Sequence, residues 1–155
     1  MRARELAVEF PVVTPDSSAM DAAELLAEHH LPGLIVVDGR DRPVAVLPAS
    51  QVMGSLIPRY VQDDPALARV YDEGHADRLC ANLEGRRVAD MLPRAREAPP
   101  IVDADATAME IAQVMASARS PVVAVAGDAR RTDAPMIGVV TASALLGRLL
   151  AAAGR

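Results

Sequence analysis

Residues 12–38 read VVTPDSSAMDAAELLAEHHLPGLIVVD, and residues 101–127 read IVDADATAMEIAQVMASARSPVVAVAG. The two stretches align without a gap, and residues 45–57 align in the same way with residues 138–150. The identical pairs are Val13/Val102, Asp16/Asp105, Ala19/Ala108, Met20/Met109, Ala23/Ala112, Ala27/Ala116, Pro32/Pro121, Val36/Val125, Val46/Val139, Ala49/Ala142, Ser50/Ser143, Gly54/Gly147 and Leu56/Leu149. Self-similarity of this kind indicates that one structural unit occurs twice in the chain.

Each copy contains the sequence pattern that starts a helix. Ser18 and Asp21 in the first copy, and Thr107 and Glu110 in the second, form a capping box. In such a box the hydroxyl accepts from a first-turn amide and the carboxylate accepts from the amide of the cap residue. Apolar residues then recur on one helical face: Met20, Ala23, Leu26 and Ala27, matched by Met109, Ala112, Met115 and Ala116. The spacing predicts an amphipathic helix in both copies.

Two strands and a second helix follow in each copy. Pro32 and Pro121 lead into apolar strands, and the turn 38–43 has the Asp, Gly and Pro chemistry of a tight reversal. The remaining predicted elements are the strands 34–37, 44–47, 122–125 and 136–140 and the helices 49–57 and 142–150. Each unit therefore has the order strand–helix–strand–strand–helix, an α+β (α/β) fold class. A unit of about 50 residues buries too little surface alone, so we expect the two to pack about a pseudo-twofold axis.

The repeats divide the chain into three parts. Residues 1–57 form the first repeat, residues 58–87 occur once, and residues 88–155 form the second repeat. The inserted segment predicts short helices over 66–71 and 75–83, with Gly85 ending the second. Its acidic residues outnumber its arginines, so we expect it to serve as a helical cover or an interaction surface.

Composition excludes several functional classes. All 16 basic residues are arginine, and a chain without lysine has neither a Walker-type phosphate loop nor a Schiff-base nucleophile. A lone cysteine excludes an internal disulfide framework. Three aromatic residues and a net charge of −5 disfavour nucleic-acid binding. The longest apolar runs have the length of strands, and the first residues have no signal core, so we expect a cytoplasmic protein without a membrane span.

Two features of the inserted region concern metal or thiol chemistry. Asp72, Glu73, His75 and Asp77 form the one cluster with metal-ligand chemistry, but their spacing favours a solvated acidic helix, and we predict no metal site. Cys80 is predicted to be a small buried hydrophobic residue.

Four arginines flank the start of the second repeat: Arg86, Arg87, Arg94 and Arg96. In an acidic chain, salt bridges to Asp or Glu of the same protein explain them better than nucleic-acid binding does.

The doubled pattern resembles a known family. The order of the elements, the capping boxes, the proline before the middle strand and the stretch 138–141 (GVVT) are together similar to the cystathionine-β-synthase (CBS) domain. Residues 88–91 resemble the short element that precedes many such repeats, and residues 3–6 are a weaker copy of it. Two copies in one short chain resemble a stand-alone CBS pair, also called a Bateman module.

The resemblance implies a regulatory module and not an enzyme. Such pairs have two clefts related by the pseudo-twofold axis, and many bind AMP, ADP, ATP or S-adenosylmethionine there. The binding state is passed to a partner, which here would be an enzyme or transporter supplied in trans. The resemblance also implies a homodimer, for which the apolar helix faces at Val52/Leu56 and Leu145/Leu149 are candidates, although core packing explains them more simply. The alternative is a ligand-free dimerisation or interaction module with degenerate clefts.

The family's ligand signature is a Ser or Thr at the end of the last strand, with an Asp three residues later. In the second copy Thr141 keeps the hydroxyl, and Ala144 stands at the Asp position. In the first copy Pro48 replaces the hydroxyl, and Gln51, a neutral group able to hydrogen-bond a ribose, replaces the Asp. We therefore expect a ligand in the cleft of the second copy. The alternative for Thr141 is a hydroxyl that bonds the local backbone.

The other candidate cleft residues come from equivalent places in the two copies. They are Val13, Thr14, Leu31 and Pro32 in the first copy and Val102, Asp103, Arg119, Ser120 and Pro121 in the second. Arg119 has two interpretations: it binds an anionic group of the ligand, or it is a solvated arginine favoured by the dipole at a helix C-terminus.

Overall fold

The order of elements repeats in the two halves of the chain. This computed structural model describes residues 1–70, 74, 78–94, 97–131 and 133–155. The first half contains α1 (Ala3–Leu6), α2 (Ala19–Glu28), β1 (Gly33–Val37), β2 (Pro43–Pro48) and α3 (Ala49–Leu56). The described part of the inserted segment contains α4 (Arg59–Asp63) and two 3₁₀-helices, η1 (Pro65–Val70) and η2 (Leu79–Leu83). The second half contains α6 (Val88–Met91), β3 (Ile101–Asp103), α7 (Ala108–Ala118), β4 (Val122–Ala126), β5 (Met136–Thr141) and α8 (Ala142–Ala152).

The predicted caps start the two long amphipathic helices. In α7 the capping box is complete, since the Thr107 hydroxyl accepts from the amide of Glu110 at 3.3 Å and the Glu110 carboxylate accepts from the amide of Thr107 at 2.7 Å. In α2 the Ser18 hydroxyl accepts from the amide of Asp21, also at 3.3 Å. Among the described residues, no helix has both the length and the apolar character that crossing a bilayer requires.

The strands form two small sheets. β1 and β2 are antiparallel, and β4 pairs with β3 in parallel and with β5 antiparallel. The predicted first strand of the first repeat is reduced to one parallel bridge between Val13 and Val36. The fold class is confirmed: two αβ units of the same order, each with helices on its own sheet.

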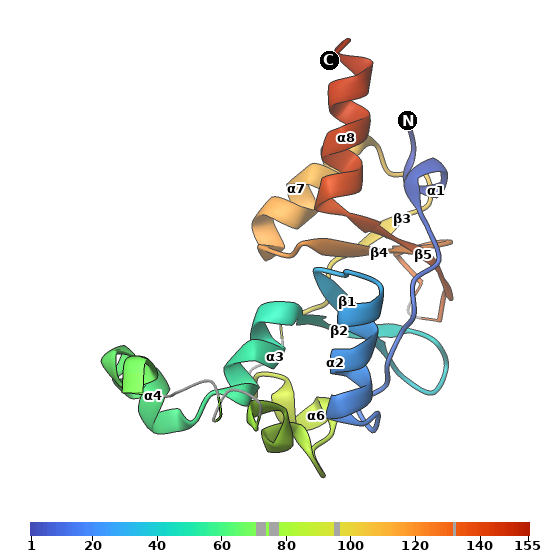
Figure 1. Cartoon of the computed structure of the whole chain (residues 1–155). Coiled ribbons are helices and arrows are strands. Elements are labelled where there is room, and N and C mark those ends of the chain that lie inside the picture. The colour runs from blue at the N-terminus through green and yellow to red at the C-terminus, as the bar shows by residue number, and fades with distance from the viewer. Residues whose placement is uncertain (71–73, 75–77, 95–96, 132) are drawn as a thin grey trace.

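The centre of the protein lies between the two sheets. β1 and β4 are buried along their whole length. Because side chains alternate along a strand, Leu34 and Val36 of β1 pack with the helices of the first half, whereas Ile35 packs against β4 and β5. Figure 1 shows α2 and α3 on one side of these central strands and α7 and α8 on the other.

The short helices α1 and α6 are exchanged between the halves. Ala3 and Leu6 of α1 are buried in the core of the second half, and Val88 and Met91 of α6 are buried in the core of the first half. In Figure 1 the N-terminal segment runs from α1 past β5 before it reaches α2. The boundaries at 57/58 and 87/88 therefore divide the sequence, but they do not divide the two hydrophobic cores. Each core contains a short helix from the other repeat.

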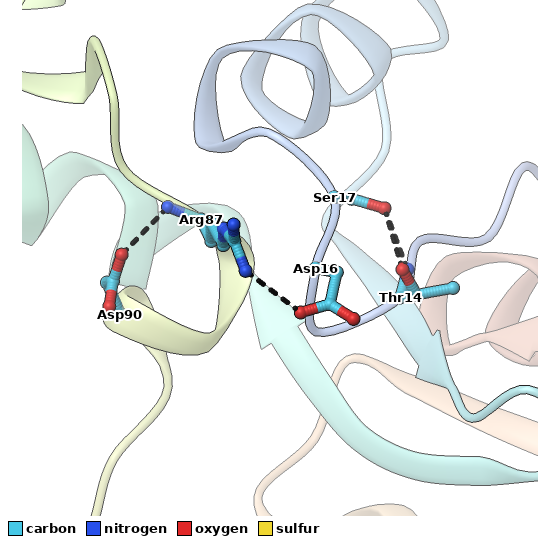
Figure 2. A network of polar contacts seen from close by, with 5 residues as sticks. All are labelled: Thr14, Asp16, Ser17, Arg87 and Asp90. Atoms are coloured by element: carbon cyan, nitrogen blue, oxygen red, sulfur yellow. Dashed lines mark hydrogen bonds and ion pairs between the residues drawn. The ribbon is translucent and has the colours of Figure 1, made fainter.

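Equivalent aspartates bind each exchanged helix, although the arginines that they pair with are not equivalent. The Arg87 side chain donates to the Asp16 carboxylate at 3.3 Å, and the Arg87 amide donates to Asp90 at 2.8 Å (Figure 2). In the other half, the Arg4 guanidinium forms a salt bridge with the Asp105 carboxylate. Asp16 and Asp105 are one of the identical pairs of the repeat, so the structure gives that identity a physical reason. Arg87 also forms the salt bridge to an acid of the same chain that the sequence predicts.

The inserted segment covers α3, as the sequence suggests, but with different elements. α4 starts before the predicted helices, and the described parts of those helices are 3₁₀. Leu83 is buried against the first core, and the Asn82 side chain donates to the Leu56 carbonyl at 2.7 Å. The cluster Asp72, Glu73, His75 and Asp77 lies outside the described residues.

The predicted burial of Cys80 is wrong, and the buried face of α7 differs from the predicted apolar face. Cys80 is exposed, because Asn82 and Leu83 provide the contacts between η2 and α3. Met109 is 77 % exposed, because it lies in the first turn of α7, and Ile111 and Met115 fill the core positions of that helix.

Candidate ligand cleft

A cavity of about 400 Å³ lies between the two repeats. Its lining comes from β2 and the start of α3 in the first half, and from the linker after α6 and the end of α7 in the second half. The residues are Ala45, Val46, Pro48, Gln51, Leu92, Pro93, Glu97, Ala98, Pro99, Pro100, Ala118, Arg119 and Ser120. The cavity therefore brings together Gln51, Arg119 and Ser120, three of the predicted ligand residues.

Two exposed polar side chains in this cavity are free to contact a ligand. Within the described part of the chain, the amide of Gln51 and the guanidinium of Arg119 have no hydrogen-bond or ion-pair partner. The Ser120 hydroxyl is engaged locally, since it donates to the Val122 carbonyl at 2.7 Å. The cavity therefore offers a cation, a neutral donor and acceptor, and the acidic Glu97 at its rim.

The local backbone holds Arg119 in an uncommon conformation. Arg119 ends α7 with φ 48°, in the left-handed region that favours glycine, and the equivalent His30, which follows the cap residue of α2, has φ 50°. A non-glycine residue there costs about 1 kcal/mol or more. Such strain is common where a side chain has to be held beside a binding site.

The walls of the cavity are apolar and stiff. Pro48, Pro93, Pro99 and Pro100 line it together with Val46. Proline fixes its own φ, so a proline-lined wall loses little conformational entropy when a ligand binds. Sequence reasoning did not include the linker residues 92, 93 and 97–100 in the site. The Pro99–Pro100 pair directly before β3 is the signal that could have indicated them.

The equivalent region of the second half is shaped differently: a cavity of about 480 Å³ is lined there by residues 9–12 and 136–138, and it does not extend to Thr141. Thr141 is only 7 % exposed, and its hydroxyl accepts from the Ala144 amide at 3.2 Å, which caps α8. The local-backbone alternative for Thr141 is therefore realised in this structure. Ala144 lines a separate shallow depression together with Glu5 and Leu6 of α1.

The remaining candidates of the first copy lie outside the cavity. Val13 is buried and exchanges backbone hydrogen bonds with β1. Thr14 bonds Ser17, with its amide donating to the Ser17 hydroxyl at 2.9 Å (Figure 2). Leu31 is buried in the first core, and the Pro32 carbonyl accepts from the first amide of α3.

The remaining candidates of the second copy have structural partners too. Val102 is buried in the second core. The Asp103 carboxylate accepts from the Ala129 amide, and the Pro121 carbonyl accepts from the Ala142 amide at 2.9 Å. Among the described residues, no group of three or more His, Cys, Asp or Glu side chains could hold a metal ion.

Comparison with known proteins identifies relatives across the whole chain. The CBS domain model matches residues 3–57. The crystal structure of a CBS domain-containing protein of unknown function from Kribbella flavida is 47 % identical, with a TM-score of 0.80, over 97 % of this chain and 99 % of that one.

A more distant relative shares the fold. The CBS-pair protein CBSX2 from Arabidopsis thaliana is 21 % identical with a TM-score of 0.71, over 99 % of this chain and 97 % of that one. A second structure, of CBSX2 in complex with AMP, has a TM-score of 0.65 at 21 % identity, over 98 % of both chains. No curated protein matches the chain.

Proposed function

The chain belongs to the CBS domain family, and on that premise we propose that it is a regulatory sensor. It binds an adenine nucleotide or a related small molecule in the cleft between its repeats and signals to a partner protein in trans. The observation that carries this proposal is the cavity that joins Gln51 of the first repeat to Arg119 and Ser120 of the second. A ligand there contacts both repeats, so its binding changes how they pack on each other.

The chemistry of the lining suits an adenosine phosphate. Val46, Pro99 and Pro100 offer flat apolar surface to a purine ring. The Gln51 side chain can donate to and accept from ribose hydroxyls, and Arg119 supplies the charge for a phosphate group. The known AMP complex of the plant protein CBSX2 makes AMP the first ligand to test.

The proposal differs from the sequence expectation in the choice of cleft. The sequence favoured the second copy because it retains Thr141. In the structure that hydroxyl is engaged as a helix cap, whereas the cleft at Gln51 is open. We therefore assign the ligand to the first copy's cleft.

A homodimer is the second part of the proposal, and α8 supports it. Leu146, Leu149 and Leu150 are 57 %, 40 % and 45 % exposed, and the helix carries a single charged residue, Arg148. At the equivalent place in α3, Leu56 is only 9 % exposed, because the inserted segment covers it. Of the two dimer faces considered from sequence, Val52, Leu56 and Leu145 are buried in the cores, and Leu149 is left for a second copy to cover.

We place the module in the cytoplasm, as part of the same proposal. Cys80 is an exposed free thiol, which suits a reducing compartment. The regulated enzyme or transporter is a separate protein in this proposal.

A thermal-shift series tests the proposed ligand. AMP, ADP, ATP and S-adenosylmethionine at millimolar concentration should each be compared with adenosine and with inorganic phosphate. We expect at least one adenosyl compound to raise the Tm, and Arg119→Ala to reduce the rise for phosphorylated ligands. Arg130→Ala removes an exposed arginine from a loop that does not line the cavity, and serves as the matched control.

The alternative function has its own outcome in this experiment. If no compound shifts the Tm of a folded dimer, the ligand-free interaction module is correct and the sensor is not. If the Tm rises equally in wild type and Arg119→Ala, the ligand binds elsewhere.

A further inference from the structure

The N-terminal segment contacts β5 in the second half. At the equivalent place along β2, the first half has the cavity that Gln51 lines. The amide of Val8 donates to the Val139 carbonyl at 3.0 Å, and the amide of Val139 donates to the Val8 carbonyl at 2.9 Å. We propose that residues 5–8 are a built-in plug that occupies the part of the second cleft beside Val139, so that an adenosyl ligand binds at Gln51 and not at Thr141; the cavity lined by residues 9–12 and 136–138 is left open. This inference rests on the proposed function for the ligand, but the plug itself does not depend on one.

Equivalent residues explain why only one cleft is filled. α1 and α6 correspond, with Arg2 matching Arg87, so Val8 corresponds to Pro93. The repeat alignment also matches Val139 with Val46, and both Pro93 and Val46 line the open cavity. Proline has no amide hydrogen, so the first half cannot form the paired bridge that the second half has.

A second difference acts in the same direction. Gly138 faces the plug so closely that a Cβ there would lie 2.9 Å from the Ala7 Cβ and 3.1 Å from the Val8 carbonyl oxygen. The equivalent residue in the first half is Ala45, which lines the open cavity. Glycine therefore admits the plug in one half, and the Ala45 methyl group occupies the corresponding space in the other.

Hydrogen bonds from the residues just before the plug anchor it to the second half. The amide of Ala3 donates to the Ala106 carbonyl at 2.9 Å, and the Arg2 guanidinium donates to the Asp105 carbonyl at 2.9 Å. Ala3 and Leu6 are buried in the second core. The plug is thus attached to the half whose cleft it occupies, and Glu5 and Leu6 line the same shallow depression as Ala144, where the family's ribose-binding Asp would stand.

Amide hydrogen exchange of the full chain tests the plug without a ligand. We expect the Val8 and Val139 amides of the wild type to exchange as slowly as those of the β4–β5 pair. Gly138→Ala should speed both by about tenfold or more, because the new methyl group displaces Ala7. Ala45→Gly, the matched change in the other half, should leave both rates unchanged.

A second variant covers the case in which Gly138→Ala does not fold. Val8→Pro removes the donor of one bridge bond, and it should speed exchange at Val139 while the β1–β2 amides stay protected. Rapid exchange of Val8 and Val139 in the wild type, or no change in either variant, overturns the plug.

Adding AMP separates the plug from the proposed function. We expect saturating AMP to slow exchange around Gln51 and Ser120 and to leave Val8 and Val139 unchanged. If AMP speeds exchange at Val8 and Val139, it has displaced residues 5–8, and this result contradicts the proposed plug. If AMP alters no amide, nucleotide binding by AMP is contradicted, and the ligand-free rates alone decide whether the plug exists.

Discussion

The cleft at Gln51 and the cleft at Thr141 occupy equivalent places in the two halves, and their contents differ. The first is a cavity of about 400 Å³, bordered by the linker that contains Pro93. The second holds residues 5–8, which pair with β5 through Val8. The ligand signature predicts the opposite order, since Thr141 is retained and the first copy has Pro48. In this protein the segment that precedes each repeat, and not the signature residue, determines which cleft is open.

The largest expected effect concerns the half that contains the plug. Gly138→Ala should lower the free energy of unfolding by about 2 kcal/mol, because overpacking against fixed backbone is costly. Ala45→Gly should cost roughly 0.5–1 kcal/mol, the usual penalty for glycine in a strand. Urea denaturation of both variants measures the difference. Equal losses in the two would show that the halves are packed alike at this position.

The second prediction restores the family's carboxylate in each half separately. Gln51→Asp should strengthen AMP binding about tenfold, because a charged acceptor bonds ribose hydroxyls more strongly than a neutral one. Ala144→Asp should leave AMP binding unchanged, since Glu5 and Leu6 lie beside that position. Isothermal titration calorimetry gives both the affinity and the number of sites. A second site created by Ala144→Asp would contradict the difference between the clefts.

The third prediction uses the two strained helix ends. Arg119→Gly and His30→Gly should each stabilise the protein by about 0.5–1 kcal/mol, because both residues have positive φ. Only Arg119→Gly should weaken AMP binding, since only Arg119 lines the cavity. Thermal denaturation and calorimetry together check this trade-off. A gain in stability with unchanged AMP affinity would remove Arg119 from the site.

The smallest expected effect is a pH dependence of the plug. The Arg2 amide and then the N-terminal amino group lower the pKa of Glu5 below its ordinary value of 4.5. A lowered pKa contributes stability that is present above about pH 4.5 and is lost as the pH falls through the folded-state value. The protection factor of the Val8 amide, which corrects for the pH dependence of intrinsic exchange, should therefore fall on acidification.

Glu5→Gln and its counterpart in the other half test that assignment. Glu5→Gln should remove this part of the pH dependence at Val8. Asp90→Asn, the equivalent change in α6, should leave Val8 exchange with its wild-type pH profile. A profile that is the same in wild type and Glu5→Gln would assign the effect to other groups.

Local chemistry made most of the fold predictable. The capping pairs Ser18/Asp21 and Thr107/Glu110 and the prolines at 32 and 121 act within a few residues of themselves, so the sequence alone located α2, α7 and the strands after them. The predicted turn after β1 is present too, with the Asp38 carboxylate accepting from the amides of residues 40 and 42.

Contacts distant in sequence limited the prediction of the site. The exchange of α1 and α6 depends on packing between halves, so no local pattern indicated that residues 5–8 lie beside Thr141. The burial of Cys80 was mispredicted for the same reason, because its environment depends on how η2 meets α3. The decisive pairs, Gly138 with Ala45 and Val8 with Pro93, are readable in the alignment of the repeats. Only the structure shows that these residues lie in the two clefts and determine how the preceding segment packs there.

A crystal structure of the full chain grown with AMP tests the central claim most directly. The account predicts one AMP per chain, between Gln51 and Arg119, with the Val8–Val139 pair intact. An AMP molecule beside Thr141, with residues 7 and 8 displaced from β5, would contradict it.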